Sequence, residues 1–375
     1  MKYRFEMDTF ELLTCPVTKL GLKYLSRSEA EGQANGKLVS RPDMPNASGD
    51  PVTPAGVSDF VLLRDDKRCA YPVIEGVPLL LAPEMLAFDS PSHQFDLCDH
   101  RYAEAYEEME FYNTRASETL RKLEETGAWG ILPTEMAASA EERETFPEPW
   151  ARWADSTHDL ASQMDSYRHL GQLKGKRILQ LGGSGTHAIK FAMAGADEAW
   201  LVTPMLAEAT IGRALAESAG VGDRFRAVVG IAEELPFKDA TFDGIYSGGS
   251  LHHTVTELSF AEANRILRPG GKFAAAEPWR APLYGMGTRL LGKREDAYCR
   301  PLTKERIKPL TSIFKESRIV RHGTLFRYAF IGFEKFGLRL PKRMVWYVGR
   351  VDDALSSFIP GLRGYGSSVA VLGEK

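Results

Sequence analysis

The chain has 375 residues, of which 43% are hydrophobic and 26% charged, and its 47 Lys and Arg nearly balance 50 Asp and Glu at a formal net charge of −3. This composition is typical of a globular protein with room for two domains, and the balanced charge excludes a general attraction to nucleic acids or anionic membranes. The opening residues MKYRFEMDTFELL mix charges with apolar residues, and no apolar run approaches the roughly 18 residues that cross a bilayer, so we expect a cytoplasmic protein without membrane insertion.

Residues 1–90 are predicted to form a small β-rich domain. The stretches LVSRPD, SDFVLL and YPVIEGVPLLL are candidate strands, with Gly76 and Pro78 as turn residues, and MPNASGDPVTPAG is expected to be a loop. LLTCPVTKLGLKYL followed by YPVIEGVPLLL resembles the zinc-ribbon-like domain known as a tRNA-methyltransferase activator. That domain often carries CPxC, and Thr18 stands here in place of the second cysteine, so the resemblance implies the shape rather than the metal.

The cysteines of the chain predict no disulfide framework and no metal site. Cys15, Cys69, Cys98 and Cys299 are far apart and form no CxxC pair. The stretch HQFDLCDH brings two histidines close to Cys98, but no second ligand pair of the usual zinc spacing accompanies it. Packing or surface roles are therefore favoured over zinc binding.

Residues 91–170 are predicted to be a helical cap or linker. RYAEAYEEMEFYNTRASETLRKLEET and EPWARWADSTHDLASQMDSYRHL place apolar and aromatic residues at helical spacing. Two roles are open for such a cap, which can pack passively on the next domain or close over a substrate.

Residues 171–375 are predicted to form an α/β domain with a doubly wound, mostly parallel sheet. Short apolar stretches such as KRILQLG, EAWLVTP, RFRAVVG, FDGIYSGG and KFAAAEP alternate with helical ones such as THAIKFAMAGA and MLAEATIGRALAESAG. Strands separated by helices of this length imply right-handed crossovers and parallel pairing.

The end of the α/β domain is predicted to contain a helical insertion. TKERIKPLTSIFKE reads as a helix, and SRIVRHG and SSVAVLGEK as strands that flank an aromatic-rich insertion at about 324–365. Between Arg289 and Arg350, Lys and Arg outnumber Asp and Glu roughly three to one. This bias indicates either a solvated basic face or recognition of an anionic substrate or surface.

The turn LQLGGSGTH marks the expected ligand site. In a doubly wound sheet, ligands bind at the carboxyl ends of the strands near the topological switch point. Gly182, Gly183 and Gly185 allow a tight turn and a close approach of the backbone to a ligand.

Further motifs support a family resemblance over about Leu170–Pro278. GIAEELPFKDATFDGIYSGGSLHHT followed by EANRILRPGGKFAAAEP resembles the class I S-adenosylmethionine-dependent methyltransferases, especially small-molecule enzymes of the ubiquinone/menaquinone-biosynthesis type. The resemblance implies a Rossmann-like methyltransferase fold and S-adenosyl-L-methionine as cofactor. It also implies a set of cofactor-binding positions, with Leu235 and Phe237 walling the adenine: Gln180, Gly182, Gly183, Ser184, Gly185, Thr186, Thr203, Ala232, Glu233, Ser247 and Gly248.

The sequence departs from the family pattern where acidic residues are usual. Gln180 replaces the acid of the first strand, Thr203 the ribose-binding acid and Ile231 the aspartate beside the adenine, while Ser184 and Thr186 occupy glycine positions. Neutral acceptors could still bind the hydroxyl groups, each worth on the order of 1 kcal/mol. The alternative is a vacant or altered cofactor site.

The candidate catalytic residues are His253, His252 and Glu277. A histidine near the acceptor can take a proton from a hydroxyl group or an acidic carbon. Because LHH is common in the family, either histidine could instead pack or cap. Glu277 could orient an acceptor or bind a cation, and its alternative role is bonding to a loop.

The prediction is a methyltransferase that acts on the oxygen, nitrogen or carbon of a small-molecule acceptor. The alternatives are a scaffold with a vacant pocket, non-methyl chemistry in the same pocket and, less favoured, RNA methylation. The sequence contains no dedicated nucleic-acid motif, and homo-oligomerisation stays open.

Overall fold

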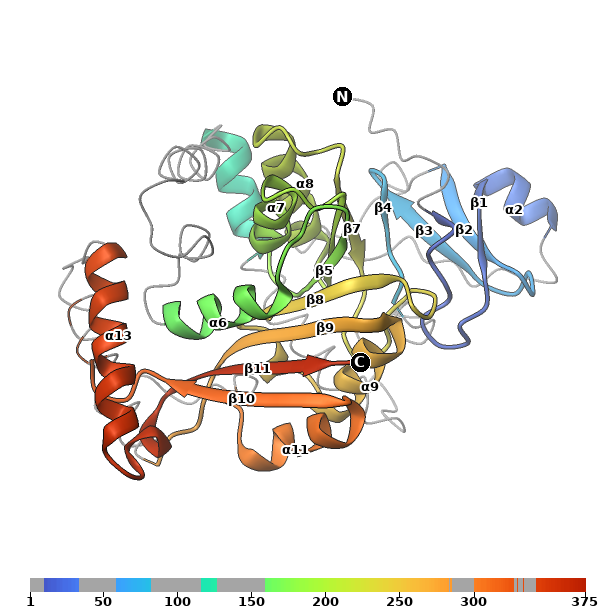
Figure 1. Ribbon diagram of the computed structural model, residues 1–375. Coiled ribbons are helices and arrows are strands. Elements are labelled where there is room, and N and C mark those ends of the chain that lie inside the picture. Colours follow the sequence, from blue (N-terminus) through green and yellow to red (C-terminus); the bar gives the residue numbers. More distant parts are fainter. Residues whose placement is uncertain are drawn as a thin grey trace, which may run out of the picture.

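The computed structural model describes residues 10–33, 59–81, 116–126, 159–282, 284, 300–326, 329, 333 and 342–375. These residues form two β-sheets, one of four strands and one of seven (Figure 1). Among them, no helix combines the length and the apolarity that a membrane span requires.

The N-terminal sheet is antiparallel, with the order β1-β2-β3-β4, and the short helix α2 (Arg27–Gln33) follows its first strand. Its strands are β1 (Leu22–Ser26), β2 (Phe60–Arg64), β3 (Ala70–Ile74) and β4 (Val77–Pro78).

The prediction of one strand with Pro78 as a turn residue is wrong, because YPVIEGVPLLL contains a hairpin. Glu75 and Gly76 turn the chain with φ of 49° and 80°, and Pro78 pairs with Val73 in β4. A two-residue turn in which both φ values are positive matches the twist of the strands that it joins. The expected strand LVSRPD and the loop MPNASGDPVTPAG lie outside the described residues.

The second sheet confirms the predicted doubly wound α/β class. Its order is β10-β11-β9-β8-β5-β6-β7, and the pairs from β9 to β7 are parallel, while β11 is antiparallel to both β9 and β10. The chain order reverses between β5 and β8, where a crevice opens at the carboxyl ends of these neighbouring strands. The strands are β5 (Arg177–Leu181), β6 (Glu198–Thr203), β7 (Phe225–Val229), β8 (Phe242–Gly248), β9 (Leu267–Pro278), β10 (Glu316–His322) and β11 (Ser368–Glu374).

Helices cover both faces of this sheet, α6, α7 and α8 on one and α9 and α11 on the other (Figure 1). α6, which the sequence analysis assigned to the end of the cap, packs directly on β9 and β11 of the sheet. The helices are α6 (Leu160–Leu170), α7 (Thr186–Met193), α8 (Leu206–Ser218), α9 (Thr256–Ile266) and α11 (Lys304–Ile313).

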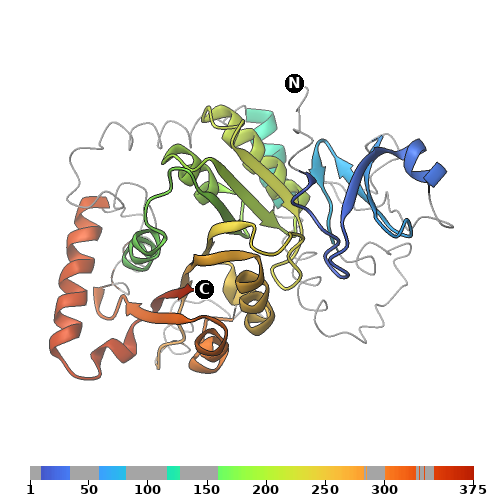
Figure 2. The same cartoon turned by 45° about the vertical axis from the view of Figure 1, so that its right-hand side comes forward.

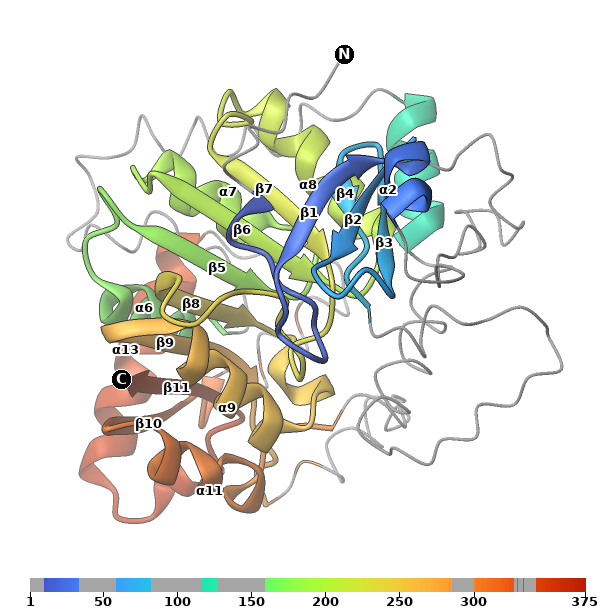
Figure 3. The same ribbon diagram turned by 90° about the vertical axis from the view of Figure 1, so that its right-hand side faces the viewer.

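The N-terminal unit packs against the β7 edge of the large sheet (Figure 3). Leu79 forms a parallel bridge with Val229 at the end of β7, and the amide of Leu80 donates to the carbonyl of Val229. Lys19 donates from its ammonium group to Glu262 at 2.8 Å and to the carbonyl of Leu235 at 3.2 Å. The N-terminal unit therefore supports the loop that follows β7, one wall of the crevice.

The predicted insertion between β10 and β11 contains α13 (Lys342–Phe358) and the short 3₁₀ helix η5 (Leu362–Tyr365). α13 packs on α6 and β10 at the edge of the molecule opposite the N-terminal unit (Figures 1 and 2).

Candidate functional site

A cavity of about 280 Å³ lies at the carboxyl ends of β5, β6, β7 and β8. We call it the crevice cavity. It is lined by glycine-rich backbone, apolar side chains and a few polar groups: Leu181, Gly182, Gly183, Val202, Pro204, Met205, Glu208, Gly230, Ile231, Ala232, Glu233, Ser247, Gly248, Gly249, Ser250, Leu251, His253 and Thr254. Such a concave, mostly apolar site with a few convergent polar groups is typical of small-molecule binding.

The glycine turn after β5 requires glycine for two physical reasons. Gly182, Gly183 and Gly185 have φ between 71° and 80°, a backbone conformation that costs other residues energy. A Cβ on Gly182 would also collide with the side chain of Ser250, another residue that lines the cavity. The turn therefore brings bare backbone to the wall of the cavity.

Gln180 lies beneath this turn and outside the lining of the cavity. Its amide nitrogen donates to the carbonyl of Gly182 at 2.7 Å, and its amide oxygen accepts from the backbone amide of Ala188 at 2.7 Å. The side chain therefore ties the turn to the first turn of α7. Ser184, Gly185 and Thr186 also lie outside the lining residues.

Glu277 is fully buried and accepts several hydrogen bonds from residues beside the cavity. Its carboxylate accepts from Oγ of Ser247 at 2.8 Å, from the backbone amides of Ser250, Leu251 and His252, and from Nδ1 of His252 at 2.7 Å. Burial alone raises the pKa of a carboxyl group, but the hydrogen bond and charge of His252 and the other donors hold the pKa of Glu277 below its usual value. These contacts agree with the loop-bonding alternative for Glu277.

The two histidines have different surroundings. His252 is buried against Glu277 and does not line the cavity, whereas His253 does. Their rings are tilted by 39° to each other, with centroids 4.0 Å apart. His253 is therefore the better placed of the two for contact with an acceptor.

Glu208 is a cavity residue that the sequence predictions missed. It lies in the first turn of α8, and its Oε2 accepts from Oγ1 of Thr203 at 2.5 Å. Burial raises the pKa of Glu208, against the opposing effects of the Thr203 hydrogen bond and of the charge of His253. The missed signal is an acid five residues after Thr203, where the second strand passes into its helix.

The loop after β7 supplies the remaining wall. Ala232 and Glu233, expected beside the adenine, line the cavity, and one oxygen of Glu233 accepts from the amide of Val255 at 2.8 Å at the start of α9. Leu235 and Phe237, expected to wall the adenine, are fully buried in the hydrophobic core and do not line the cavity.

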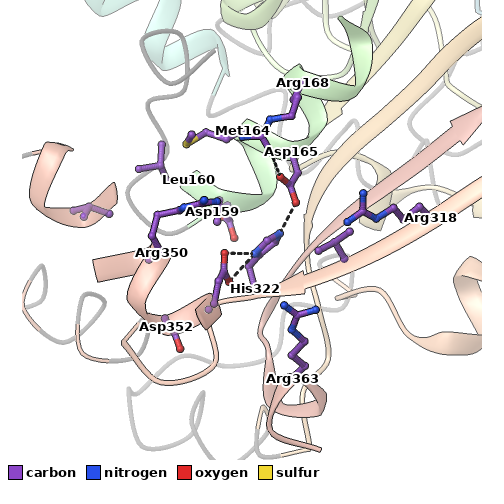
Figure 4. A pocket seen from close by; sticks show the side chains of 16 residues that line it. Asp159, Leu160, Met164, Asp165, Arg168, Arg318, His322, Arg350, Asp352 and Arg363 are labelled. Carbon is purple, nitrogen blue, oxygen red and sulfur yellow. Dashed lines mark hydrogen bonds and ion pairs between the residues drawn. The ribbon is translucent and has the colours of Figure 1, made fainter. Parts of the chain in front are cut away.

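A second cleft of about 270 Å³ lies between α6, β10 and α13 (Figure 4). His322 lies at its base, where Nδ1 is 2.8 Å from Asp353 of α13 and Nε2 is 3.0 Å from Asp165 of α6 (Figure 4). Burial alone would lower the pKa of His322, but these two carboxylates raise it to about 9. The side chain is thus a cation that joins three elements.

In the described part of the chain, no group of three or more His, Cys, Asp and Glu residues could hold a metal ion. Cys15 and Cys69 are buried, and Sγ of Cys15 lies 3.0 Å from the hydroxyl of Tyr71. The HQFDLCDH stretch lies outside the described residues.

Comparison with known proteins identifies the segment that forms the crevice. Residues 179–275 match the family described as "Methyltransferase domain". The chain is 36% identical over 107 residues to a 27-O-demethylrifamycin SV methyltransferase of Amycolatopsis mediterranei, covering 28% of this chain and 39% of the relative. It is 36% identical over 116 residues to the ubiquinone/menaquinone biosynthesis C-methyltransferase UbiE of Dinoroseobacter shibae, covering 30% and 46%. The chain thus spans less than half the length of these curated relatives.

Solved structures show lower similarity. A geranyl diphosphate methyltransferase in complex with SAM aligns with a TM-score of 0.42 at 17% identity, covering 62% of this chain and 92% of that one. The cyclase SpnF aligns with a TM-score of 0.39 at 17% identity, covering 60% and 85%.

Proposed function

We propose that the protein is an S-adenosylmethionine-dependent methyltransferase with a small-molecule acceptor. One observation carries this proposal: every residue that lines the crevice cavity, from Leu181 to Thr254, falls within the segment 179–275 that matches the methyltransferase domain. The similarity therefore covers the walls of the cavity itself.

The residues that line the cavity fit the chemistry of the cofactor. Gly182 and Gly183 present bare backbone to the cavity, as expected for close contact with the amino-acid end of the cofactor. Ala232 would lie beside the adenine, and Ser247 and Gly248 near the sulfonium. When bound, the cofactor supplies an electrophilic methyl group.

The protein's own contribution is positioning and proton removal. Methyl transfer requires the nucleophile in line with the methyl–sulfur bond. His253 faces the cavity and would accept the proton of an acceptor that must lose one. Glu277 and His252 do not line the cavity. Their hydrogen bonds hold the backbone of the loop that carries His253.

The acceptor class is proposed as a small molecule, with the methylated atom open. The relatives named above include one O-methyltransferase and one C-methyltransferase. A sterol 24-C-methyltransferase of Gibberella zeae, 30% identical over 123 residues, is also named for methylation of carbon. That match covers 31% of each chain.

Mass spectrometry of small molecules released from the purified full chain tests the proposal. We expect S-adenosylhomocysteine or S-adenosylmethionine to be released in amounts close to that of the protein. Release of neither, together with no saturable uptake of added S-adenosylhomocysteine, would favour the vacant-pocket alternative.

A further inference from the structure

Thr203 stands at the carboxyl end of β6, where a cofactor-binding acid was expected, yet a carboxylate does reach this position. Oε2 of Glu208 lies 2.5 Å from Oγ1 of Thr203. The two residues belong to consecutive elements, the end of β6 and the first turn of α8. The end of β6 thus has no acidic residue of its own, but the carboxylate of Glu208 lies beside it.

The Glu208 carboxylate has unused acceptor capacity directed at the cavity. An ionised carboxylate offers about four acceptor sites. Within the described part of the chain, the Thr203 hydroxyl is its one hydrogen-bond donor, and Glu208 lines the crevice cavity. Its remaining acceptor sites are therefore available to a ligand in the cavity that carries hydrogen-bond donors.

Two neighbouring hydroxyl groups satisfy these requirements. A carboxylate can accept from both members of a vicinal diol, and such charge-assisted bonds are roughly twice as strong as neutral ones. The position of Glu208 in the first turn of α8 also favours negative charge, because the amino end of a helix is electropositive. A diol that occupies this wall would lie between the glycine turn and Ala232.

We propose that Glu208, held by Thr203, is the carboxylate that binds the two ribose hydroxyls of the cofactor. The inference rests on the proposed function and adds to it a binding residue on the helix. It also explains how the cofactor can bind although Gln180 and Thr203 stand where acidic residues were expected.

A ligand-residue double-mutant cycle tests this role by titration calorimetry, without any turnover assay. The ligands are S-adenosylhomocysteine and its 2′,3′-dideoxyribose analogue, and the proteins are wild type, Glu208→Gln and Glu217→Gln. Glu217 is an exposed glutamate in the last turn of the same helix and serves as the matched control.

We expect the dideoxy analogue to bind wild type at least about tenfold more weakly than S-adenosylhomocysteine, the size of one strong hydrogen bond. Glu208→Gln should lose about tenfold in affinity for S-adenosylhomocysteine and should discriminate little between the two ligands, while Glu217→Gln behaves as wild type.

Equal affinity of wild type for both ligands would overturn the inference, even if Glu208→Gln failed to fold. Unchanged discrimination in a folded Glu208→Gln protein would overturn it as well, and both results leave the proposed function intact. Absence of any binding to wild type would instead overturn the proposed function and this inference with it.

Discussion

At the scale of single residues, Glu277 shows how a buried charge is kept where the site needs it. The carboxylate has no exposed surface and accepts five hydrogen bonds, three of them from consecutive backbone amides of residues 250–252. A buried charge without such partners would cost several kcal/mol. Its role is therefore to fix the backbone that presents His253.

Replacing Glu277 with Gln should destabilise the protein by about 2–4 kcal/mol, because a neutral amide cannot accept from all five donors. Urea unfolding measures the change, and the exposed Glu316→Gln on β10 is the control. Since its pKa is lowered in the folded state, Glu277 contributes stability above the usual carboxyl pKa and loses it as the pH falls below that range. Equal stability of the variant and wild type would contradict a stabilising role of these hydrogen bonds.

His253→Asn should lower turnover about 100-fold with an acceptor that must lose a proton, because a positioned general base contributes that much or more. Its affinity for S-adenosylhomocysteine should change less than about threefold, since the glycine turn and Glu208 are untouched. Rate and binding measurements on the same preparation separate the two effects. Undiminished turnover would exclude His253 as the base.

Several site residues could be predicted from sequence because backbone geometry demands them. Positive φ at Gly182 and Gly183 and the position of the turn after β5 follow from general rules. Glu208 was missed although an acid five residues after Thr203 was visible in the sequence, because only the folded chain shows that this helix side chain reaches the end of β6. Gln180 was expected to bind the cofactor, and in the structure its side-chain amide donates a hydrogen bond to the carbonyl of Gly182 in the glycine turn.

At the scale of elements, His322 joins β10, α6 and α13 around the second cleft (Figure 4). A histidine whose pKa rises to about 9 in the folded state stabilises it fully below the usual value near 6.5. That stabilisation is lost as the pH rises through 9, and it amounts to about 3 kcal/mol, because each pKa unit is worth 1.36 kcal/mol.

We therefore expect the wild-type free energy of unfolding to fall by up to about 3 kcal/mol between pH 6.5 and pH 9. His322→Gln should lose most of this slope, and His169→Gln, which changes a partly buried histidine on α6, should keep it. Denaturant unfolding at the two pH values measures the difference. A variant with the wild-type slope would show that His322 is not the titrating group.

Alternation of apolar and helical stretches was enough to predict the five parallel strands of the large sheet, because such strands are buried on both faces and are strongly apolar. The antiparallel strands β10 and β11 were predicted too, although β10 is largely exposed. The turn at Gly76 was predicted and is confirmed, but the pairing of strands on its two sides was missed, since continuous apolar character makes them look like one strand. α6 was assigned to a cap because its sequence is amphipathic, and only tertiary packing assigns it to the α/β unit.

At the scale of the whole molecule, two units meet at the edge of β7. The N-terminal unit contacts the end of β7 through the Leu79 bridge and the loop after β7 through the hydrogen bond from Lys19 to Leu235. This loop supplies Ile231, Ala232 and Glu233 to the crevice cavity. The insertion that carries α13 lies at the opposite edge of the sheet, beside β10. All residues that line the cavity thus come from residues 181–254, and the N-terminal unit contacts the loop that forms one of its walls.

Titration of the full chain with S-adenosylhomocysteine, followed by calorimetry, is the most direct test of whether the crevice holds an adenosyl cofactor. We predict saturable binding of one ligand per chain in wild type and at least about tenfold weaker binding in Ala232→Trp, whose larger side chain would fill the cavity. A folded wild-type protein that takes up no ligand at millimolar concentration, or that binds as well after Ala232→Trp, would contradict this assignment.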